Sequence, residues 1–302
     1  MFASATFGDT KGRGMNIREV RQLYARQVLA LAGADSDKRL EKAFATVPRE
    51  HFLGGRRWHA VTPWAPHLRL HANDPSLLYQ DVVISLDPKR GVNNGSPSLH
   101  AWMMHKVGPL TGATVVHAGA GAGYFSAILA ELVGKKGRVL AIEYDKSLAK
   151  FAKENLRPWR NVEVLNADGK NCALPLADLI YVNFAVIRPA VTWVDNLKEG
   201  GRLLFPLGTP EREARFVGRH AMHAVALLVR RRRKEFEAQA LREVSFVFAE
   251  GSDTAVESSE ERRLRRALAS RGWQNVSTLY WKQRAKGRCW YAAKDWALGV
   301  KT

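Results

Sequence analysis

The 302-residue chain contains only two cysteines, Cys172 and Cys289, which lie far apart. Neither belongs to a C-x-x-C pair or to a cluster of cysteine and histidine, so the sequence predicts neither a disulfide framework nor a metal site. Long apolar runs are also missing, since no stretch approaches the roughly 20 residues that cross a bilayer. The first residues lack the apolar core of a secretory signal. We therefore expect a cytoplasmic protein that does not enter a membrane.

Acidic residues are scarce relative to basic ones. The chain has 29 Asp and Glu against 47 Lys and Arg, a formal net charge of +18. Such a charge attracts polyanions or acidic proteins through its long-range potential, and it says nothing about the fold. The densest basic run, residues 230–234, follows an apolar stretch and is typical of a solvated turn at a strand end. A surface that serves solubility and a face for acidic partners or nucleic acid both fit this composition.

From residue 114 onward, strand-like and helix-like segments alternate. The expected strands are 114–117, 138–142, 162–166, 179–183 and 202–206, and the expected helices between them are 124–133, 146–155 and 189–197. This alternation predicts a parallel sheet with right-handed crossovers. Two apolar runs between 221 and 248 have no helix between them and predict an antiparallel pair at the sheet edge. The expected fold is therefore α/β and Rossmann-like, with a mostly parallel twisted sheet and antiparallel edge strands.

The regions on either side of this unit are less regular. We expect a disordered leader at 1–14 and a helical and loop segment at 15–110, with helices at 17–31 and 38–46. The α/β unit covers 111–251, and a small α+β appendix covers 252–302, with a helix capped at Ser258 and a hairpin formed by 278–283 and 288–292. The appendix interleaves aromatic with basic residues. Its aromatics either pack on one face of the strands or stack on nucleic-acid bases.

Three glycines, Gly119, Gly121 and Gly123, follow the first predicted strand of this unit, and the next strand ends in Glu143. Glycine tolerates the left-handed dihedrals and the close backbone approach that a sharp strand-to-helix turn beside a ligand demands. Glu143 is then placed to accept hydrogen bonds from both hydroxyls of a ribose. The spacing is G-x-G-x-G, one residue short of the pyrophosphate-binding fingerprint, which favours S-adenosylmethionine. An ordinary glycine-rich turn is the alternative interpretation.

Several segments together resemble the protein-L-isoaspartate O-methyltransferase family, from about residue 39 to residue 251. The likeness is carried by the entry segment 43–52 (AFATVPREHF), by Tyr79-Gln80-Asp81, by 97–101 (PSLHA), by the glycine loop, by Ile142-Glu143, by Ala167-Asp168-Gly169 and by 197–208 (LKEGGRLLFPLG). The glycine loop and the last stretch occur widely among methyltransferases, whereas the upstream segments are more specific.

The resemblance implies a class I methyltransferase with an S-adenosylmethionine site. By this likeness the cofactor contacts Gly119, Ala120, Gly121, Ala122, Gly123, Tyr124 and Tyr144, with Glu143 at the ribose, Asp168 and Gly169 at the adenine, and His100 nearby. Two of these assignments have structural alternatives. Asp168 and Gly169 also suit a plain turn after a strand, and His100 also suits a helix-start residue packed on the sheet.

The chain departs from the family pattern at two places. Where the family has an acid that helps to hold the methionyl end of the cofactor, this chain has His117. The family's T-x-S-x-P loop carries a serine implicated in activity, but here Gly95 holds that position and Ser96 follows it. Ser96 is our candidate catalytic residue, while Asn93 and Asn94 are candidates for orienting a substrate carboxyl or amide beside the cofactor. A plain Asn-Gly turn is the alternative.

These observations lead to a methyltransferase that resembles the isoaspartyl carboxyl methyltransferases, with either the family's substrate or an altered one. The expected partner is a protein or peptide carboxylate, and the basic surface suits an acidic one. Methylation of RNA or another polyanion, guided by the appendix, is a second hypothesis. The stretch 183–186 (NFAV) lacks the Pro-Pro-aromatic pattern of base-amine methylases, which weakens that reading. A scaffold that binds the cofactor without turnover is a third hypothesis, since the usual acid and serine are both missing.

Overall fold

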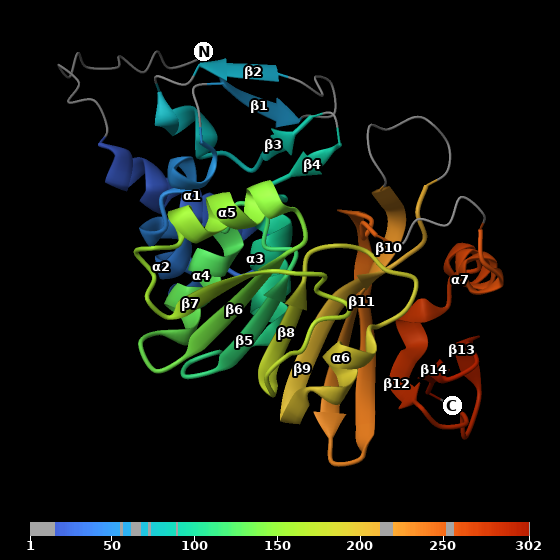
Figure 1. The fold of residues 1–302 in the computed structure, drawn as a ribbon. Coiled ribbons are helices and arrows are strands. Elements are labelled where there is room, and N and C mark those ends of the chain that lie inside the picture. The colour runs from blue at the N-terminus through green and yellow to red at the C-terminus, as the bar shows by residue number, and fades with distance from the viewer. Residues whose placement is uncertain are drawn as a thin grey trace, which may run out of the picture.

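The computed structural model describes residues 16–54, 57–61, 68–71, 74–88, 90–211, 220–251 and 257–301. Within these ranges, helices cover a large β-sheet, and a smaller sheet lies beyond one end of it (Figure 1). The helices are α1 (Ile17–Leu31), α2 (Lys38–Thr46), α3 (Pro97–Val107), α4 (Tyr124–Val133), α5 (Lys146–Asn155), α6 (Val191–Asp195) and α7 (Ser259–Ala269), with 3-10 turns η1 (Arg49–Phe52), η2 (Pro75–Leu78) and η3 (Trp273–Asn275). The strands are β1 (Arg57–Val61), β2 (Leu68–His71), β3 (Val83–Asp87), β4 (Val92–Asn93), β5 (Thr114–Ala118), β6 (Arg138–Glu143), β7 (Val162–Asn166), β8 (Ala177–Val182), β9 (Leu197–Leu207), β10 (His220–Arg232), β11 (Glu235–Val247), β12 (Val276–Trp281), β13 (Cys289–Ala292) and β14 (Trp296–Val300).

The large sheet has the strand order β13-β14-β12-β11-β10-β9-β8-β5-β6-β7. Its strands β9, β8, β5, β6 and β7 are parallel, and β10 and β11 continue it in antiparallel fashion. The α/β, Rossmann-like fold with antiparallel edge strands is therefore confirmed. Because β12, β14 and β13 extend the same sheet, its antiparallel part is longer than the sequence predicted.

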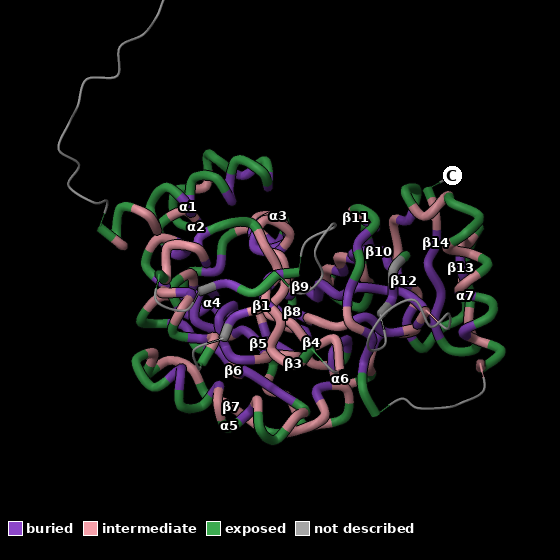
Figure 2. Tube along the Cα trace, turned by 90° about the horizontal axis from the view of Figure 1, so that it is seen from above, coloured by how far each residue is buried: buried purple, intermediate pink, exposed green. Residues whose placement is uncertain are grey.

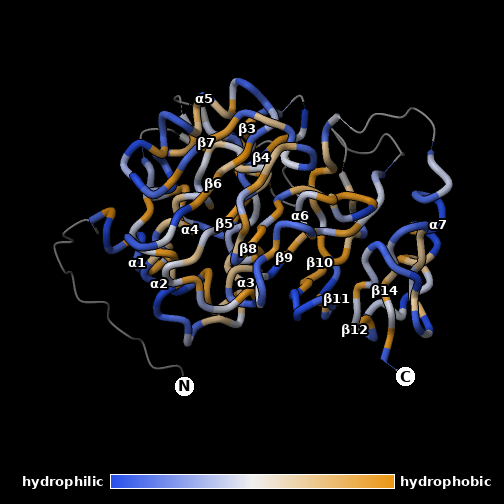
Figure 3. Tube along the Cα trace, turned by 60° about the horizontal axis from the view of Figure 1, so that its bottom comes forward, coloured by the Kyte–Doolittle hydropathy of each residue, from blue (hydrophilic) through white to orange (hydrophobic). Residues whose placement is uncertain are grey.

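Both faces of the central parallel strands β5 and β8 are buried. Val115 and Tyr181 point into the core formed with α1 to α4, whereas Val116 and Ile180 point into the core formed with α6 and the C-terminal segment. Buried residues follow the central strands and exposed ones the outer surfaces of the helices (Figure 2), and the strands are correspondingly apolar (Figure 3). Strands buried on both faces read as continuous apolar runs, which is why the sequence revealed them.

The small sheet, in the order β2-β1-β3-β4, lies in the segment that the sequence predicted as helices and loops. Arg49 of η1 is buried, and its guanidinium donates to the carbonyls of Leu78 (2.6 Å), Gln80 (2.8 Å) and Val82. These bonds connect η1 to the segment that leads into β3. The sheet also fixes the loop that follows β4. Asn94 donates its backbone N–H to Ile84 O (2.9 Å), and its Oδ1 accepts from Ile84 N (2.8 Å).

The C-terminal segment corrects one prediction. The hairpin expected between 278–283 and 288–292 is wrong, because β14 lies between β12 and β13 and pairs with both. The backbone of β14 pairs with a strand on each side, and no local pattern in the sequence reveals this third strand of five residues. Of the interleaved aromatics, Trp281, Tyr291 and Trp296 are buried. Their burial supports the packing alternative over stacking on bases.

The predicted leader at 1–14 lies outside the described residues. Among the helices that the structure describes, none has the length and apolar character needed to cross a bilayer.

Candidate functional site

The glycine loop joins β5 to α4 and adopts backbone angles that favour glycine. Gly119, Gly121 and Gly123 have φ of +80°, +55° and +98°. A Cβ at Gly119 would lie 2.8 Å from the ring of Phe184, and one at Gly123 would lie 2.8 Å from Leu156. The loop therefore requires glycine both for its dihedral angles and for its close neighbours, as the sequence predicted for a tight bend beside a ligand.

Glu143 ends β6 and reaches into the bend of the glycine loop. Its Oε2 accepts from Gly121 N (2.7 Å) and its Oε1 accepts from Asp145 N (2.9 Å). Burial raises the pKa of this carboxyl, while the hydrogen bonds from Asp145 and Gly121 act in the opposite direction. A carboxylate has about four acceptor sites, so after these two bonds it still has free lone pairs for hydroxyl donors.

A pocket opens beside this carboxylate, and we call it the Glu143 pocket. The space between its walls is about 730 Å³, a volume that includes open solvent at its mouth. Its lining residues are Arg90, Val92, Asn93, Gly119, Gly121, Ile142, Glu143, Tyr144, Leu148, Asp168, Gly169, Lys170, Asn183, Phe184, Val247, Phe248, Ala249 and Glu250. The pocket lies at the carboxyl ends of the parallel strands, where α/β folds bind ligands.

A second pocket, the Ser96 pocket, adjoins the first and has about 1020 Å³ with its mouth included. It is lined by Val61, Val83, Asn93, Asn94, Gly95, Ser96, Leu99, His100, Gly119, Ala120, Gly121, Ala122, Tyr124, Phe125, Asn183, Ser245, Phe246 and Val247. The two pockets share Asn93, Gly119, Gly121, Asn183 and Val247. A ligand in the first pocket would therefore lie against the glycine loop from which the second pocket opens.

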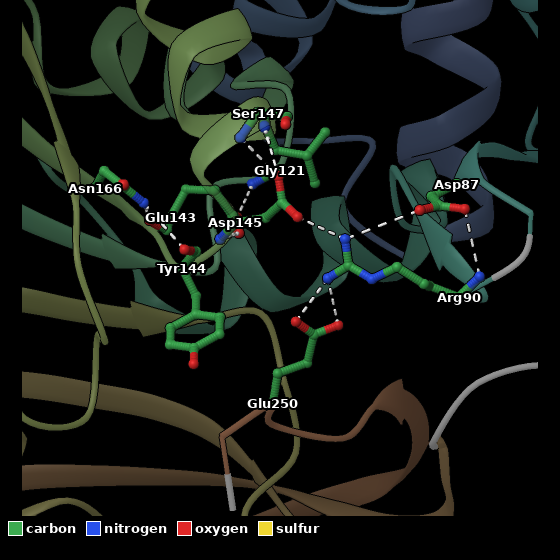
Figure 4. A network of polar contacts seen from close by, with 10 residues as sticks. Asp87, Arg90, Gly121, Glu143, Tyr144, Asp145, Ser147, Asn166 and Glu250 are labelled. Carbon is green, nitrogen blue, oxygen red and sulfur yellow. Dashed lines mark hydrogen bonds and ion pairs between the residues drawn. The ribbon is translucent and has the colours of Figure 1, made fainter.

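Arg90 ties three loops together at the rim of the Glu143 pocket (Figure 4). Its guanidinium donates to Asp145 Oδ2 (2.5 Å) and to both carboxylate oxygens of Glu250 (2.6 Å each). Asp145 also caps the start of α5, accepting from Ser147 N and Leu148 N. Because Glu250 follows β11 and Asp145 follows β6, this contact joins the antiparallel edge to the parallel half of the sheet. We call these three residues the Arg90 latch.

The loop 93–96 does not leave room for the family's serine. Gly95 has φ +76°, and a Cβ there would lie 2.4 Å from Nε2 of His100 and 3.1 Å from the ring of Phe125. His100 stacks on Phe125 at a centroid distance of 3.7 Å, and its Nδ1 is 2.7 Å from the hydroxyl of Tyr181. The imidazole thus occupies the space into which a side chain at position 95 would project.

The hydroxyl of Ser96 belongs to the start of α3. Ser96 Oγ accepts from Leu99 N (3.4 Å) and lies 3.4 Å from a carboxylate oxygen of Asp81. Asn93 forms a local turn through its Oδ1, which accepts from Gly95 N (2.9 Å). The side chain of Asn94 differs, since its Nδ2 is buried without a hydrogen-bond partner among the described residues. Asn94 lines the Ser96 pocket, and this amide is a buried donor without a partner among the described residues.

His117 is fully buried in β5. Its Nδ1 is 2.7 Å from Ser126 Oγ, and its Nε2 makes no hydrogen bond of normal geometry with a described residue. Burial lowers its pKa to about 3, with the neighbouring side chain of Asn183 acting weakly in the opposite direction. Burial also lowers the pKa of His100. Both imidazoles are therefore neutral near pH 7, and His117 supplies no charge where the family has an acid.

The structure brings most of the predicted site residues together. Those that line the Glu143 pocket are Asn93, Gly119, Gly121, Glu143, Tyr144, Asp168 and Gly169, and those that line the Ser96 pocket also include Asn94, Gly95, Ser96, His100, Ala120, Ala122 and Tyr124. His117 and Gly123 line neither pocket. Asp168 closes a turn, accepting from Lys170 N (3.0 Å) and Asn171 Nδ2 (2.7 Å), while Gly169 O accepts from Trp193 Nε1 (2.6 Å).

Several lining residues were missed by the sequence analysis. Asn183 and Phe184 follow β8, so their position after a parallel strand was a usable signal. Arg90, Phe248 and Glu250 come from loops far away in the sequence, and no local pattern marks them.

The comparisons with known proteins agree with this geometry. The family model described as Protein-L-isoaspartate(D-aspartate) O-methyltransferase (PCMT) matches residues 26–254, which is most of the chain. The protein-L-isoaspartate O-methyltransferase of Thermotoga maritima is 32% identical over 174 residues, which cover 56% of this chain and 50% of that relative. The chain thus spans only half the length of that relative.

Two solved structures share the fold. A protein-L-isoaspartate O-methyltransferase has a TM-score of 0.60 and 27% identity, covering 76% of this chain and 66% of that one. A Plasmodium falciparum protein assigned to the same enzyme type, in complex with S-adenosyl-L-homocysteine, has a TM-score of 0.57 and 19% identity, covering 76% and 97%. The fold, the site at the ends of the parallel strands and the long family match lead to one assignment: this chain belongs to the protein-L-isoaspartate(D-aspartate) O-methyltransferase family.

Proposed function

We propose that this protein is an S-adenosylmethionine-dependent methyltransferase that methylates carboxylates of proteins or peptides, with isoaspartyl residues as the first substrate class. The observation that carries the proposal is a buried carboxylate, Glu143, bonded to the backbone of the glycine loop at Gly121, where two pockets meet. One pocket suits the adenosyl group and the other suits the methyl acceptor. Family membership supports the same reaction.

The residues of the Glu143 pocket fit the cofactor. The free lone pairs of Glu143 are placed for the ribose hydroxyls, and the absence of side chains at Gly119 and Gly121 lets a ligand approach the backbone. Asp168 and Gly169 line the same pocket and are proposed to face the adenine. Phe184 and Phe248 supply apolar surface for a ring.

When bound, S-adenosylmethionine supplies an electrophilic methyl group, which the substrate oxygen accepts as the carbon–sulfur bond breaks toward sulfur. A substrate carboxylate is already a nucleophile, so the protein need not remove a proton. The residues of the Ser96 pocket therefore act by orientation and by excluding water. Asn94 Nδ2 is proposed to hold the acceptor carboxylate, with neutral His100 beside it and Ser96 as the hydroxyl at the pocket wall.

The test is methyl transfer from cofactor labelled in its methyl group to two peptides that differ only in carrying isoaspartyl or normal aspartyl at one position. We expect base-labile label on the isoaspartyl peptide. Label on the aspartyl peptide alone would keep the reaction and change the substrate. Label on RNA, or calorimetric binding of S-adenosylhomocysteine without transfer to peptide, protein or RNA, would replace the proposal by the polyanion or the scaffold hypothesis.

The division into 15–110, 111–251 and 252–302 stays a proposal. Deleting 252–302 tests the last boundary, and β12 pairs with β11 across it. The cytoplasmic location also stays a proposal, for which the free thiols of Cys172 and Cys289 suit a reducing compartment.

A further inference from the structure

The outer face of α5 carries a stripe of positive charge. Lys146, Lys150 and Lys153 follow one another at steps of four and three residues, which places them on one side of the helix, and Arg157 follows in the turn after α5. All four are exposed, and none forms an ion pair with another described residue. At a rise of about 1.5 Å per residue, the three lysines on the helix span roughly 10 Å. Unlike the guanidinium of Arg90, these cations are available to a partner.

This stripe borders a groove. Two hollows, of about 910 and 1130 Å³ with their open sides included, lie between α5 and β7 and share Lys150, Lys153 and Val164. Lys146 and Asn166 line the first, and Arg157 lines the second. We call the two hollows together the α5–β7 groove. Glu154 and Glu163 also line its second half, so the groove keeps a net positive charge.

The floor of the groove is a sheet edge. β7 ends the strand order of the large sheet, and on its inner side it pairs with β6. Asn161 O accepts from Val139 N, and Ala167 N donates to Glu143 O, so the odd-numbered residues of this segment direct their backbone groups toward β6. Because this direction alternates along a strand, the backbone N–H and C=O of Val164 point away from β6, toward the open edge of the sheet. An extended peptide recognises such an edge through backbone hydrogen bonds, with its side chains read by the flanking residues.

We propose that the α5–β7 groove docks an extended, acidic segment of the protein substrate, outside the pocket in which methyl transfer takes place. Acidic residues at alternate positions of an extended chain are about 6.6 Å apart, close to the roughly 5–6 Å between successive cations on the helix. The groove starts at the cofactor site, because Lys146 follows Asp145 of the Arg90 latch and β7 leads to Asp168. The inference rests on the proposed function, since the docked segment belongs to the methyl acceptor.

A peptide fits the groove better than a nucleic acid does. Binding of single strands generally adds stacking of bases on exposed aromatic rings to phosphate contacts. The aromatic residue in the groove, Trp159, packs against Phe52 with 5.7 Å between the ring centroids, and its indole N–H donates to a carboxylate oxygen of Glu131 (2.8 Å). The sheet edge, by contrast, offers backbone groups that match a peptide.

The experiment compares two peptides that carry the same isoaspartyl acceptor, one with an alternating acidic tail and one with a serine tail. The variant Lys150→Glu/Lys153→Glu reverses the centre of the stripe. Its control, Lys135→Glu/Lys136→Glu, makes the same charge change at exposed positions in the turn between α4 and β6. We expect the stripe variant to raise KM for the acidic-tail peptide about tenfold, with kcat and the serine-tail peptide unchanged. The control should leave both peptides unchanged.

Equal KM values for the two peptides in the wild type, or an equal rise in the control variant, would overturn the docking site. Fluorescence anisotropy of the labelled acidic tail measures docking without turnover, so a failure of methyl transfer is distinguished from a failure of docking. An oligonucleotide of equal charge that binds more tightly than the tail, and is lost only in the stripe variant, would reassign the groove to nucleic acid.

Discussion

Removing the guanidinium of Arg90 should open the rim of the Glu143 pocket. In the structure, Arg90 bonds to Asp145 and Glu250, and its side chain is 38% exposed. Exposed ion pairs contribute roughly 0.2–1 kcal/mol each, and the paired contacts to Glu250 place this latch near the upper end of that range. In the Arg90→Ala variant, the contacts that hold the pocket rim together should be weaker by about 1–2 kcal/mol. This free energy corresponds to roughly a 5- to 30-fold faster dissociation of S-adenosylhomocysteine.

Removing the Arg90 guanidinium should also change the pKa of Glu143. The negative charges of Asp145 and Glu250 raise the pKa of Glu143, and without Arg90 they are no longer balanced, so that pKa should rise further. Stopped-flow displacement of a fluorescent cofactor analogue measures the dissociation rate. High salt should shrink the difference from wild type, since ions screen an exposed latch. The matched control is Arg232→Ala, which removes a paired arginine at the far tip of β10. Equal dissociation rates for the wild type and Arg90→Ala would refute the latch.

Three further predictions concern the pockets. Burial raises the pKa of Glu143, so this carboxylate should become protonated, and cofactor affinity should fall, at a pH above the usual glutamate range. In calorimetric titrations, the Glu143→Gln variant should bind the cofactor about 10- to 100-fold more weakly than the wild type and should lose this pH dependence. In urea titrations, the Gly95→Ser variant should have a free energy of unfolding lower by about 2 kcal/mol or more, because its side chain would clash with His100. Adding His100→Ala to this variant should restore part of the lost stability. Strictly additive effects of the two substitutions would argue against the clash. His117→Gln should change the Kd of S-adenosylhomocysteine less than threefold, since His117 lines neither pocket; a tenfold loss would place it in the site.

The sequence predicts the parallel half of this protein well, because its signals are local. The helices α4 and α5 have the predicted bounds, and so does β7. The glycine loop and Glu143 were identifiable for the same reason. A bend that has no room for side chains requires glycine, and a carboxylate at the end of the next parallel strand must lie beside that bend.

The remaining features depend on contacts between distant segments. Arg90 meets Glu250 across 160 positions of sequence, and neither residue stands in a motif. The position of β14 between β12 and β13 depends on backbone pairing with both strands, which no local pattern marks. Gly95 illustrates the same limit, since its pattern read as a lost serine, while the structure places the ring of His100 in that space.

The central claim is that Glu143 and the glycine loop hold an adenosyl group. A crystal structure of the protein with S-adenosylhomocysteine tests it most directly. We expect both ribose hydroxyls to donate to the Glu143 carboxylate and the adenine to lie beside Asp168, with the homocysteine sulfur directed toward the Ser96 pocket. A ligand bound elsewhere, or one whose ribose lies away from Glu143, would contradict the account.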